Sequence, residues 1–203
     1  MKLAIISGSH RKDAQSLKVA KVVKSYLDSG ICDESWLFSL SGNPLPLWDQ
    51  GVWDGDPQWK ELLTPIRQQL ASSDGFVVVT PEWHGQVPAG LKNFFLLFGK
   101  NELGHKPALI VSVSSGDGGA YPVAELRMSS YKNSRICYIP EQVIVRKVEK
   151  VLNDNSADND ERSDTYYRER LPWALKILKE YALALTSVRE SGATVSDMFK
   201  NGM

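Results

Sequence analysis

The sequence lacks the features that mark several classes of protein. Lysine plus arginine number 24, as do aspartate plus glutamate, so there is no basic excess of the kind that neutralises nucleic-acid phosphates. The zero net charge also disfavours a small electron carrier that docks through a strongly acidic face. No apolar run approaches the ~20 residues that a helix needs to cross a bilayer. We therefore expect no nucleic acid and no membrane as partners.

Cysteine is also scarce. Cys32 and Cys137 are the only two, and they match neither a metal spacing nor a redox pair, so no metal site is expected. Because the first residues also show no signal-peptide pattern, we expect a cytoplasmic protein. The chain of 203 residues has the composition of an ordinary globular protein. We expect one domain over residues 1–190 and a frayed tail over residues 191–203.

The first loop lacks the two familiar phosphate-binding motifs. It follows an apolar run at residues 2–7, which is predicted to be a strand because it is too short for a helix. Residues 7–16 contain a single glycine, which excludes the G-x-G-x-x-G motif, and they lack the Gly-Lys-Ser/Thr ending of a P-loop. Apolar residues at near-helical spacing follow, so the loop leads into a helix.

The same loop does contain groups that bind phosphate. The amides at a helix N-terminus attract anions. Ser9 and Ser16 add hydroxyl donors, and Arg11 adds a guanidinium. A serine-capped helix with a solvated arginine is the competing interpretation, and the loop alone does not decide between the two. A phosphate bound by hydroxyls and one arginine fits a mononucleotide such as FMN.

Two further loops follow predicted strands and precede predicted helices. Residues 81–93 come after the apolar run 76–80 and carry a wide aromatic, an imidazole and a carboxylate between prolines and glycines. Residues 114–120 come after the apolar run 108–113, and their glycines allow backbone to approach a ligand closely. A flexible surface loop is the alternative for the second stretch, but its position between a strand and a helix favours a ligand.

The alternation of strands and helices predicts the fold. The expected strands are residues 2–7, 35–40, 76–80, 108–113 and at least one of 135–139 and 143–148. Such alternation implies an α/β protein with a parallel sheet covered on both faces. In the flavodoxin-like order 2-1-3-4-5, the strands before the three loops are adjacent, so the loops converge. We therefore expect a three-layer sandwich with one ligand site at the carboxyl ends of the strands.

The remaining segments give further expectations. Residues 153–164 have almost no apolar content and are expected to form an exposed loop. The longest helical pattern spans residues 166–188, and Pro172 places the start of its regular part near Leu171. Three tryptophans within residues 48–59 are expected to form an aromatic lid over the core.

The three loops also resemble a known family. The sequence is similar to the NAD(P)H-dependent FMN reductases, a flavodoxin-like group that includes quinone, chromate and azo-dye reductases. The resemblance covers Met1 to about Val145. It rests on Gly8-Ser9-x-Arg11 with Gln15-Ser16, on residues 81–93, and on residues 116–127.

The resemblance implies FMN as the cofactor and NADPH or NADH as the co-substrate. The implied FMN-binding residues are Ser9, Arg11, Gln15 and Ser16 for the phosphate, Pro81, Glu82, Trp83, His84 and Gly85 for the isoalloxazine ring, and Ser114, Ser115, Gly116 and Gly119 beside the ring and the ribityl chain. Because flavin chemistry requires no nucleophile from the protein, no catalytic residue is demanded. His84 is the one candidate proton donor, against the alternative that only its backbone matters. Glu82 is expected to brace a loop or contact a second subunit.

The sequence departs from the family pattern at several positions. Trp83 stands where tyrosine is usual, His84 where many members have asparagine, and Ala14 where serine is common. The aspartate often found after Leu-Lys-Asn is absent. These departures concern the shape of the substrate more than flavin binding.

The expected function is an FMN-dependent NAD(P)H oxidoreductase. It would pass electrons to a quinone, a flavin, a metal ion or a similar small acceptor. One alternative is a flavin-binding electron carrier or redox sensor that does not oxidise NAD(P)H, and another is a module that has lost its flavin. The resemblance also implies a homodimer or homotetramer, with segments 48–59 and 94–98 as candidate interfaces.

Overall fold

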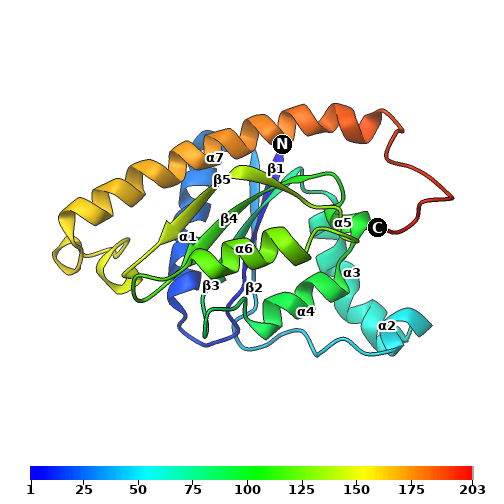
Figure 1. Cartoon of the computed structure of the whole chain (residues 1–203), viewed down its shortest axis with the longest axis horizontal. Helices are drawn as coiled ribbons and strands as arrows, with labels where there is room; N and C mark the ends of the chain where they lie inside the picture. The colour runs from blue at the N-terminus through cyan, green and yellow to red at the C-terminus, as the bar shows by residue number, and fades with distance from the viewer. Residues whose placement is uncertain (203) are drawn as a thin grey trace.

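The five expected strands form one parallel sheet in a computed structural model, which describes residues 1–202 (Figure 1). The strands are β1 (Lys2–Ser7), β2 (Glu34–Ser39), β3 (Gly75–Pro81), β4 (Pro107–Val113) and β5 (Cys137–Val145). They follow the order β2-β1-β3-β4-β5, and every neighbouring pair is parallel. The predicted flavodoxin-like order is therefore confirmed.

Burial explains why these segments are strands. Every residue of β3 and β4 is buried, as expected for central strands that helices cover on both faces. Successive residues of one strand enter different cores. Leu3 and Ile5 belong to one apolar cluster, whereas Ala4 and Ile6 belong to the other.

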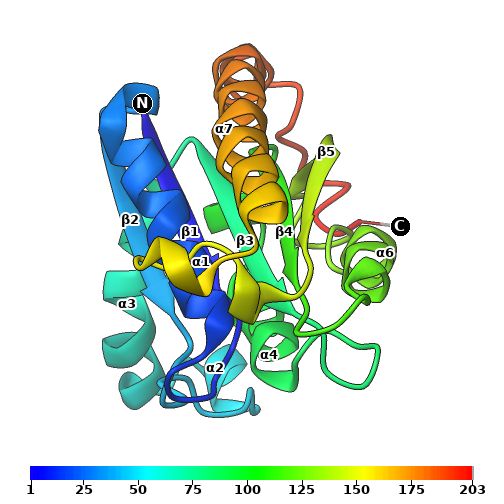
Figure 2. The same cartoon turned by 90° about the vertical axis from the view of Figure 1, so that its left-hand side faces the viewer.

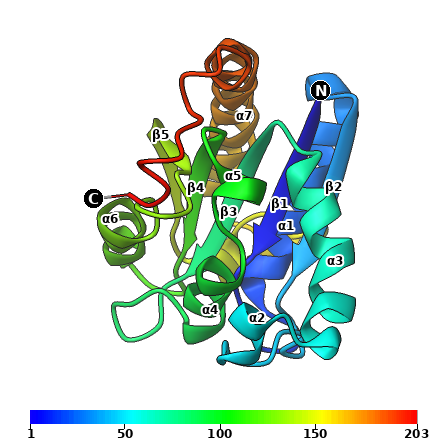
Figure 3. The same cartoon turned by 90° about the vertical axis from the view of Figure 1, so that its right-hand side faces the viewer.

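Helices cover both faces of the sheet. Figure 2 shows α1 (Gln15–Tyr26) and α7 (Glu161–Glu190) on one face, and Figure 3 shows α3 (Pro57–Ala71), α4 (Ala89–Leu97) and α6 (Ala120–Ser129) on the other. The short elements are α2 (Gly51–Asp54), α5 (Lys100–Leu103), a π-helical turn η1 (Leu27–Ile31) and two 3-10 turns, η2 (Val148–Lys150) and η3 (Ser156–Asp158). Within residues 1–202, no helix has both the length and the apolar character needed to cross a membrane.

The last helix contains the predicted pattern at residues 166–188, but its expected start is wrong. It begins at Glu161, inside the expected loop, and it continues through Pro172 rather than starting near Leu171. Asp160 caps the helix, since its side chain accepts a hydrogen bond from the Ser163 amide at 2.9 Å. Pro172 supplies no amide hydrogen inside the helix, but the apolar residues around it pack on the sheet and outweigh that loss. These buried residues are Tyr167, Leu171, Ala174, Leu175 and Leu178.

The two β-prone runs near the end of the sheet are one strand. β5 pairs with β4 on both sides of an irregularity, where Ala108 pairs with Tyr138 but Ile110 pairs with Gln142. The additional residues on β5 include Pro140, which has no amide hydrogen for the ladder. An edge strand with a bulge accommodates such a proline.

The aromatic segments are divided between core and surface. Trp59 is buried, whereas Trp53 is 74% exposed, so the three tryptophans do not form one lid. Phe94 and Phe98 are fully buried, which removes them from the candidate interface at residues 94–98. Leu96, between them, is 66% exposed.

Candidate functional site

The carboxyl ends of β1, β3 and β4 lie side by side, and the three loops that follow them surround one pocket. This loop pocket has a volume of about 230 Å³. Its lining residues are Ser9, Arg11, Asp13, Ala14, Gln15, Ser16, Pro81, Glu82, Trp83, Val113, Ser115, Val148 and Glu149. Of the predicted site residues, His84, Gly85, Ser114, Gly116 and Gly119 lie on the same loops but outside this lining. The structure therefore brings together the loops that the sequence singled out.

The first loop leaves the N-terminus of α1 open. Ala14 is the N-cap residue, and within residues 1–202 no side chain caps the helix. The first turn also contains no acidic residue. Ser16 is buried, and its hydroxyl has no hydrogen-bond partner among the described residues. The interpretation as a serine-capped helix is therefore wrong, and these groups are available to an anion.

Arg11 and Ser9 complete this end of the pocket. Ser9 is buried, and its hydroxyl oxygen accepts a hydrogen bond from the Arg11 amide at 3.3 Å. The Arg11 side chain is exposed and forms no ion pair within the described part of the chain. The acidic residues Asp13, Glu82 and Glu149 line the same pocket, so its charge is mixed.

The second loop folds into a tight turn. Trp83 and Gln86 exchange two backbone hydrogen bonds of 3.0 and 2.9 Å. The two central residues, His84 and Gly85, have φ values of 50° and 70°. Positive φ at both central positions is typical of the two-residue turns that close hairpins. The turn therefore holds the His84 side chain exposed at its tip.

His10 is a residue of this region that the sequence analysis missed. Its ring packs edge-to-face on the Trp83 ring, with the centroids 4.7 Å apart. The only signal in the sequence is its place as the variable position of the Gly8-Ser9-x-Arg11 motif.

Glu82 braces the third loop, one of the roles expected for it. Its carboxylate accepts a hydrogen bond from the Gly119 amide at 2.6 Å, and its own amide donates to the Val113 carbonyl at 3.0 Å. Arg146 holds the loop from the other side, because its Nε donates to the carbonyls of Asp117 and Gly118 at 2.8 and 2.9 Å. The sequence analysis did not find Arg146.

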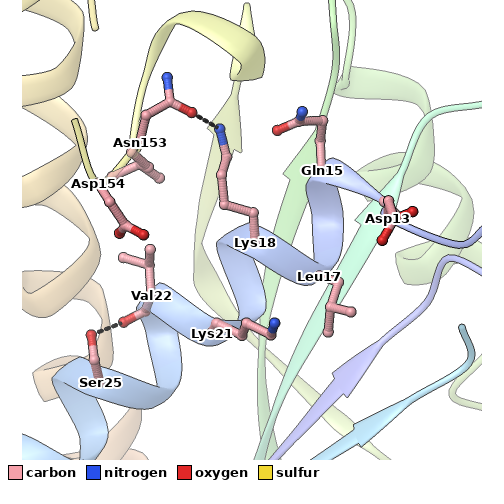
Figure 4. Close-up of a pocket in the computed structure, with 11 residues that line it drawn as sticks. Asp13, Gln15, Leu17, Lys18, Lys21, Val22, Ser25, Asn153 and Asp154 are labelled. Carbon is pink, nitrogen blue, oxygen red and sulfur yellow. Dashed lines mark hydrogen bonds between the residues drawn. The ribbon is translucent and has the colours of Figure 1, made fainter. Parts of the chain in front are cut away.

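A larger groove of about 540 Å³ runs along α1 (Figure 4). There the Lys18 ammonium donates to the carbonyls of Val148 and Val151 and to the side chain of Asn153, at 2.7, 2.9 and 2.7 Å. Burial lowers the pKa of Lys18. Since these contacts already satisfy the ammonium, it serves to tie the segment after β5 to α1. The loop pocket, where three strand ends meet, is the better candidate for chemistry.

Comparison with known proteins identifies the family. The family model described as NADPH-dependent FMN reductase matches residues 1–150. The chain belongs to this family. Over 169 residues it is 31% identical to a 2-hydroxy-1,4-benzoquinone reductase from Burkholderia sp., covering 80% of this chain and 88% of the relative. Over 147 residues it is 27% identical to an NADPH azoreductase from Bacillus sp. strain OY1-2, covering 71% and 76%.

Solved structures agree on the fold. FerB, a flavoenzyme NAD(P)H:(acceptor) oxidoreductase from Paracoccus denitrificans, matches with a TM-score of 0.67 at 22% identity, over 90% of this chain and 97% of that one. The protein is thus an NAD(P)H-dependent oxidoreductase that uses FMN, and the predicted family, fold and cofactor are confirmed. The family favours an enzyme over a carrier or sensor that does not oxidise NAD(P)H.

The packing around the third loop predicts that Gly119→Ala destabilises the fold. Gly119 has a φ of 100°, and a Cβ there would lie 2.5 Å from Ile144 Cγ2. We expect a loss of about 1–3 kcal/mol in the free energy of unfolding, measured by urea denaturation without FMN. Gly116→Ala is the matched control, because a Cβ at Gly116 meets nothing within 4 Å. Equal unfolding midpoints for the two variants would contradict this account.

Proposed function

We propose that the enzyme transfers electrons from NAD(P)H to quinones or similar small organic acceptors, with FMN bound across the three loops. The observation that carries the proposal is the buried hydroxyl of Ser16 at the N-terminus of α1, where residues 1–202 supply neither a partner for the hydroxyl nor a side-chain cap for the helix. A buried polar group without a partner is costly, and a bound phosphate would satisfy it. The residues present therefore fit the cofactor that the family requires.

The phosphate would bind to the first loop. Ser9, Ser16 and Gln15 offer side-chain donors beside the open helix terminus, and Arg11 supplies a permanent positive charge. Asp13 and Glu149 line the same pocket, which makes this charge necessary if a dianion is to bind.

The isoalloxazine ring would lie against the second and third loops. Residues 81–85 present backbone groups in a turn whose conformation the Trp83–Gln86 pair fixes. Ser114, Ser115, Gly116 and Gly119 would flank the ring and the ribityl chain. Because the Glu82–Gly119 hydrogen bond joins the second loop to the third, both loops are held in place before the cofactor binds.

In this reaction the protein serves to position the substrates. When bound, FMN accepts a hydride from the nicotinamide and returns electrons to the acceptor. Overall, NAD(P)H and one proton from solvent convert a quinone to a hydroquinone and NAD(P)⁺. The loops orient the two substrates, and no side chain has to act as a nucleophile. His84, exposed at the tip of its turn, has two candidate roles: proton donor to the acceptor, or a residue whose backbone alone matters.

The acceptor class is supported by the relatives. Their names include 2-hydroxy-1,4-benzoquinone reductase, NADPH azoreductase and, in Pseudomonas putida, quinone reductase. We also propose a cytoplasmic homodimer or homotetramer. The exposed side chains of Trp53 and Leu96 offer apolar surface for such contacts, and light scattering coupled to gel filtration tests the assembly.

Rapid mixing tests the proposed activity. The FMN-loaded protein is mixed with NADPH without oxygen, and the absorbance of oxidised flavin is followed. We expect it to bleach on a catalytic timescale and to return when a quinone is added. Flavin that stays oxidised would instead support the carrier or sensor alternative.

Arg11→Ala tests the phosphate site. The variant loses a charge-assisted hydrogen bond, so we expect FMN affinity to fall by about 1.5–3 kcal/mol, or roughly 10- to 150-fold. FMN titration followed by fluorescence quenching measures it. Lys12→Ala is the control, since Lys12 is an exposed neighbouring cation that does not line the pocket. If both variants bind FMN equally well, the phosphate assignment is wrong.

Ser16→Ala separates binding from folding. The Ser16 hydroxyl has no partner within residues 1–202, so its removal should leave the FMN-free protein as stable as before or more stable. FMN affinity should still fall about three- to tenfold. Ser25→Ala on the same helix removes a hydroxyl that bonds to the Val22 carbonyl, and it should not change FMN affinity. A Ser16→Ala protein with wild-type affinity for FMN would show that the phosphate binds elsewhere.

A further inference from the structure

A second, more open recess adjoins the loop pocket. It has a volume of about 510 Å³ and is lined by His10, Arg11, Trp83 and His84. Arg11 and Trp83 line both cavities, so the two are neighbours at the same edge of the sheet.

The two cavities differ in charge. Three acidic residues, Asp13, Glu82 and Glu149, line the loop pocket. None of the four residues of the recess is acidic. Instead, the recess presents one indole, two imidazoles and one guanidinium. This set combines an aromatic surface with hydrogen-bond donors and a permanent positive charge.

His10 is held in one orientation. Its Nδ1 is buried and has no partner among the described residues, and a Cβ at Gly90 would lie only 2.9 Å from it. The ring thus packs against the first turn of α4 on one side and against the Trp83 ring on the other, where the two ring centroids are 4.7 Å apart. Because Nδ1 is enclosed, Nε2 is the nitrogen through which His10 can donate a hydrogen bond to a ligand in the recess.

We propose that this recess is the acceptor subsite and that it selects aromatic acceptors carrying an ionised acidic group, such as a sulfonate or carboxylate. The proposal rests on the function proposed above. The indole of Trp83 contacts the acceptor ring, while His10 and His84 donate to its anionic oxygens and Arg11, engaged by the FMN phosphate, stays at the border between the two cavities. Hydrogen bonds to ionised oxygens are stronger than those to neutral ones, so the acidic group adds affinity.

Paired acceptors test this selectivity. The FMN-loaded enzyme is assayed with 1,4-naphthoquinone and with 1,4-naphthoquinone-2-sulfonate, and the ratio of their kcat/KM values is compared between variants. Taking the ratio relative to wild type removes the difference in intrinsic reactivity of the two quinones. For His10→Gln and for His84→Asn, we expect the ratio of sulfonated to unsubstituted quinone to fall about three- to tenfold.

His105→Asn is the matched control for His84→Asn. Both histidines have left-handed backbone, with φ values of 57° and 50°, a conformation that asparagine tolerates. His105 precedes β4, at the opposite end of the sheet from the recess. Its replacement should leave the ratio unchanged.

Calorimetry supplies a readout that does not depend on turnover. The oxidised, FMN-loaded protein is titrated with naphthalene-2-sulfonate and with neutral 2-naphthol. Wild type should bind the sulfonate more tightly, and His10→Gln should remove most of that preference. Equal affinities in wild type, or a quinone ratio that neither substitution changes, would overturn the proposal while leaving the proposed function intact.

Flavin bleaching by NADPH alone separates the remaining outcomes. If both histidine variants slow bleaching while the quinone ratio stays at its wild-type value, the recess binds the phosphates of NADPH, and the assignment to the acceptor is wrong. If wild type neither binds FMN nor is bleached by NADPH, the proposed function itself fails and the subsite fails with it.

Discussion

The hydrogen bond from the Gly119 amide to the Glu82 carboxylate is the contact on which the site depends. It joins the loop after β3 to the loop after β4. Gly118 makes the approach possible, because a Cβ there would lie 2.6 Å from Glu82 Oε1. Arg146 donates hydrogen bonds to two carbonyls of the loop after β4. A carboxylate thus binds an amide of this loop, and a guanidinium binds its carbonyls. A glycine-rich segment that would otherwise be mobile is thereby fixed.

The architecture could be predicted because it follows from general constraints. The apolar runs that became β3 and β4 are short and buried on both faces, which local patterning reveals. Once five such strands alternate with helices, the parallel sheet places the ends of β1, β3 and β4 together. The three loops could therefore be grouped without knowing any side-chain contact.

Other features depend on tertiary contacts that local sequence patterns do not predict. Pro172 lies inside α7 because apolar residues on both sides of it pack against the sheet, and that burial outweighs a missing hydrogen bond. Pro140 lies inside β5 because a bulge in an edge strand accommodates it. The same holds at the site, where His10 becomes part of the surface only by packing on Trp83, a residue of a different loop.

The residue at position 14 shows how a small side chain can shape the site. A serine at the N-cap would accept a hydrogen bond from an amide of the first turn and stabilise the helix by about 1 kcal/mol. Ala14 cannot do so, and the first turn of α1 has no side-chain cap within residues 1–202. In the proposed complex, the FMN phosphate takes the place of the missing cap. Because the anion then stabilises the helix that binds it, cofactor binding and the stability of α1 are thermodynamically linked.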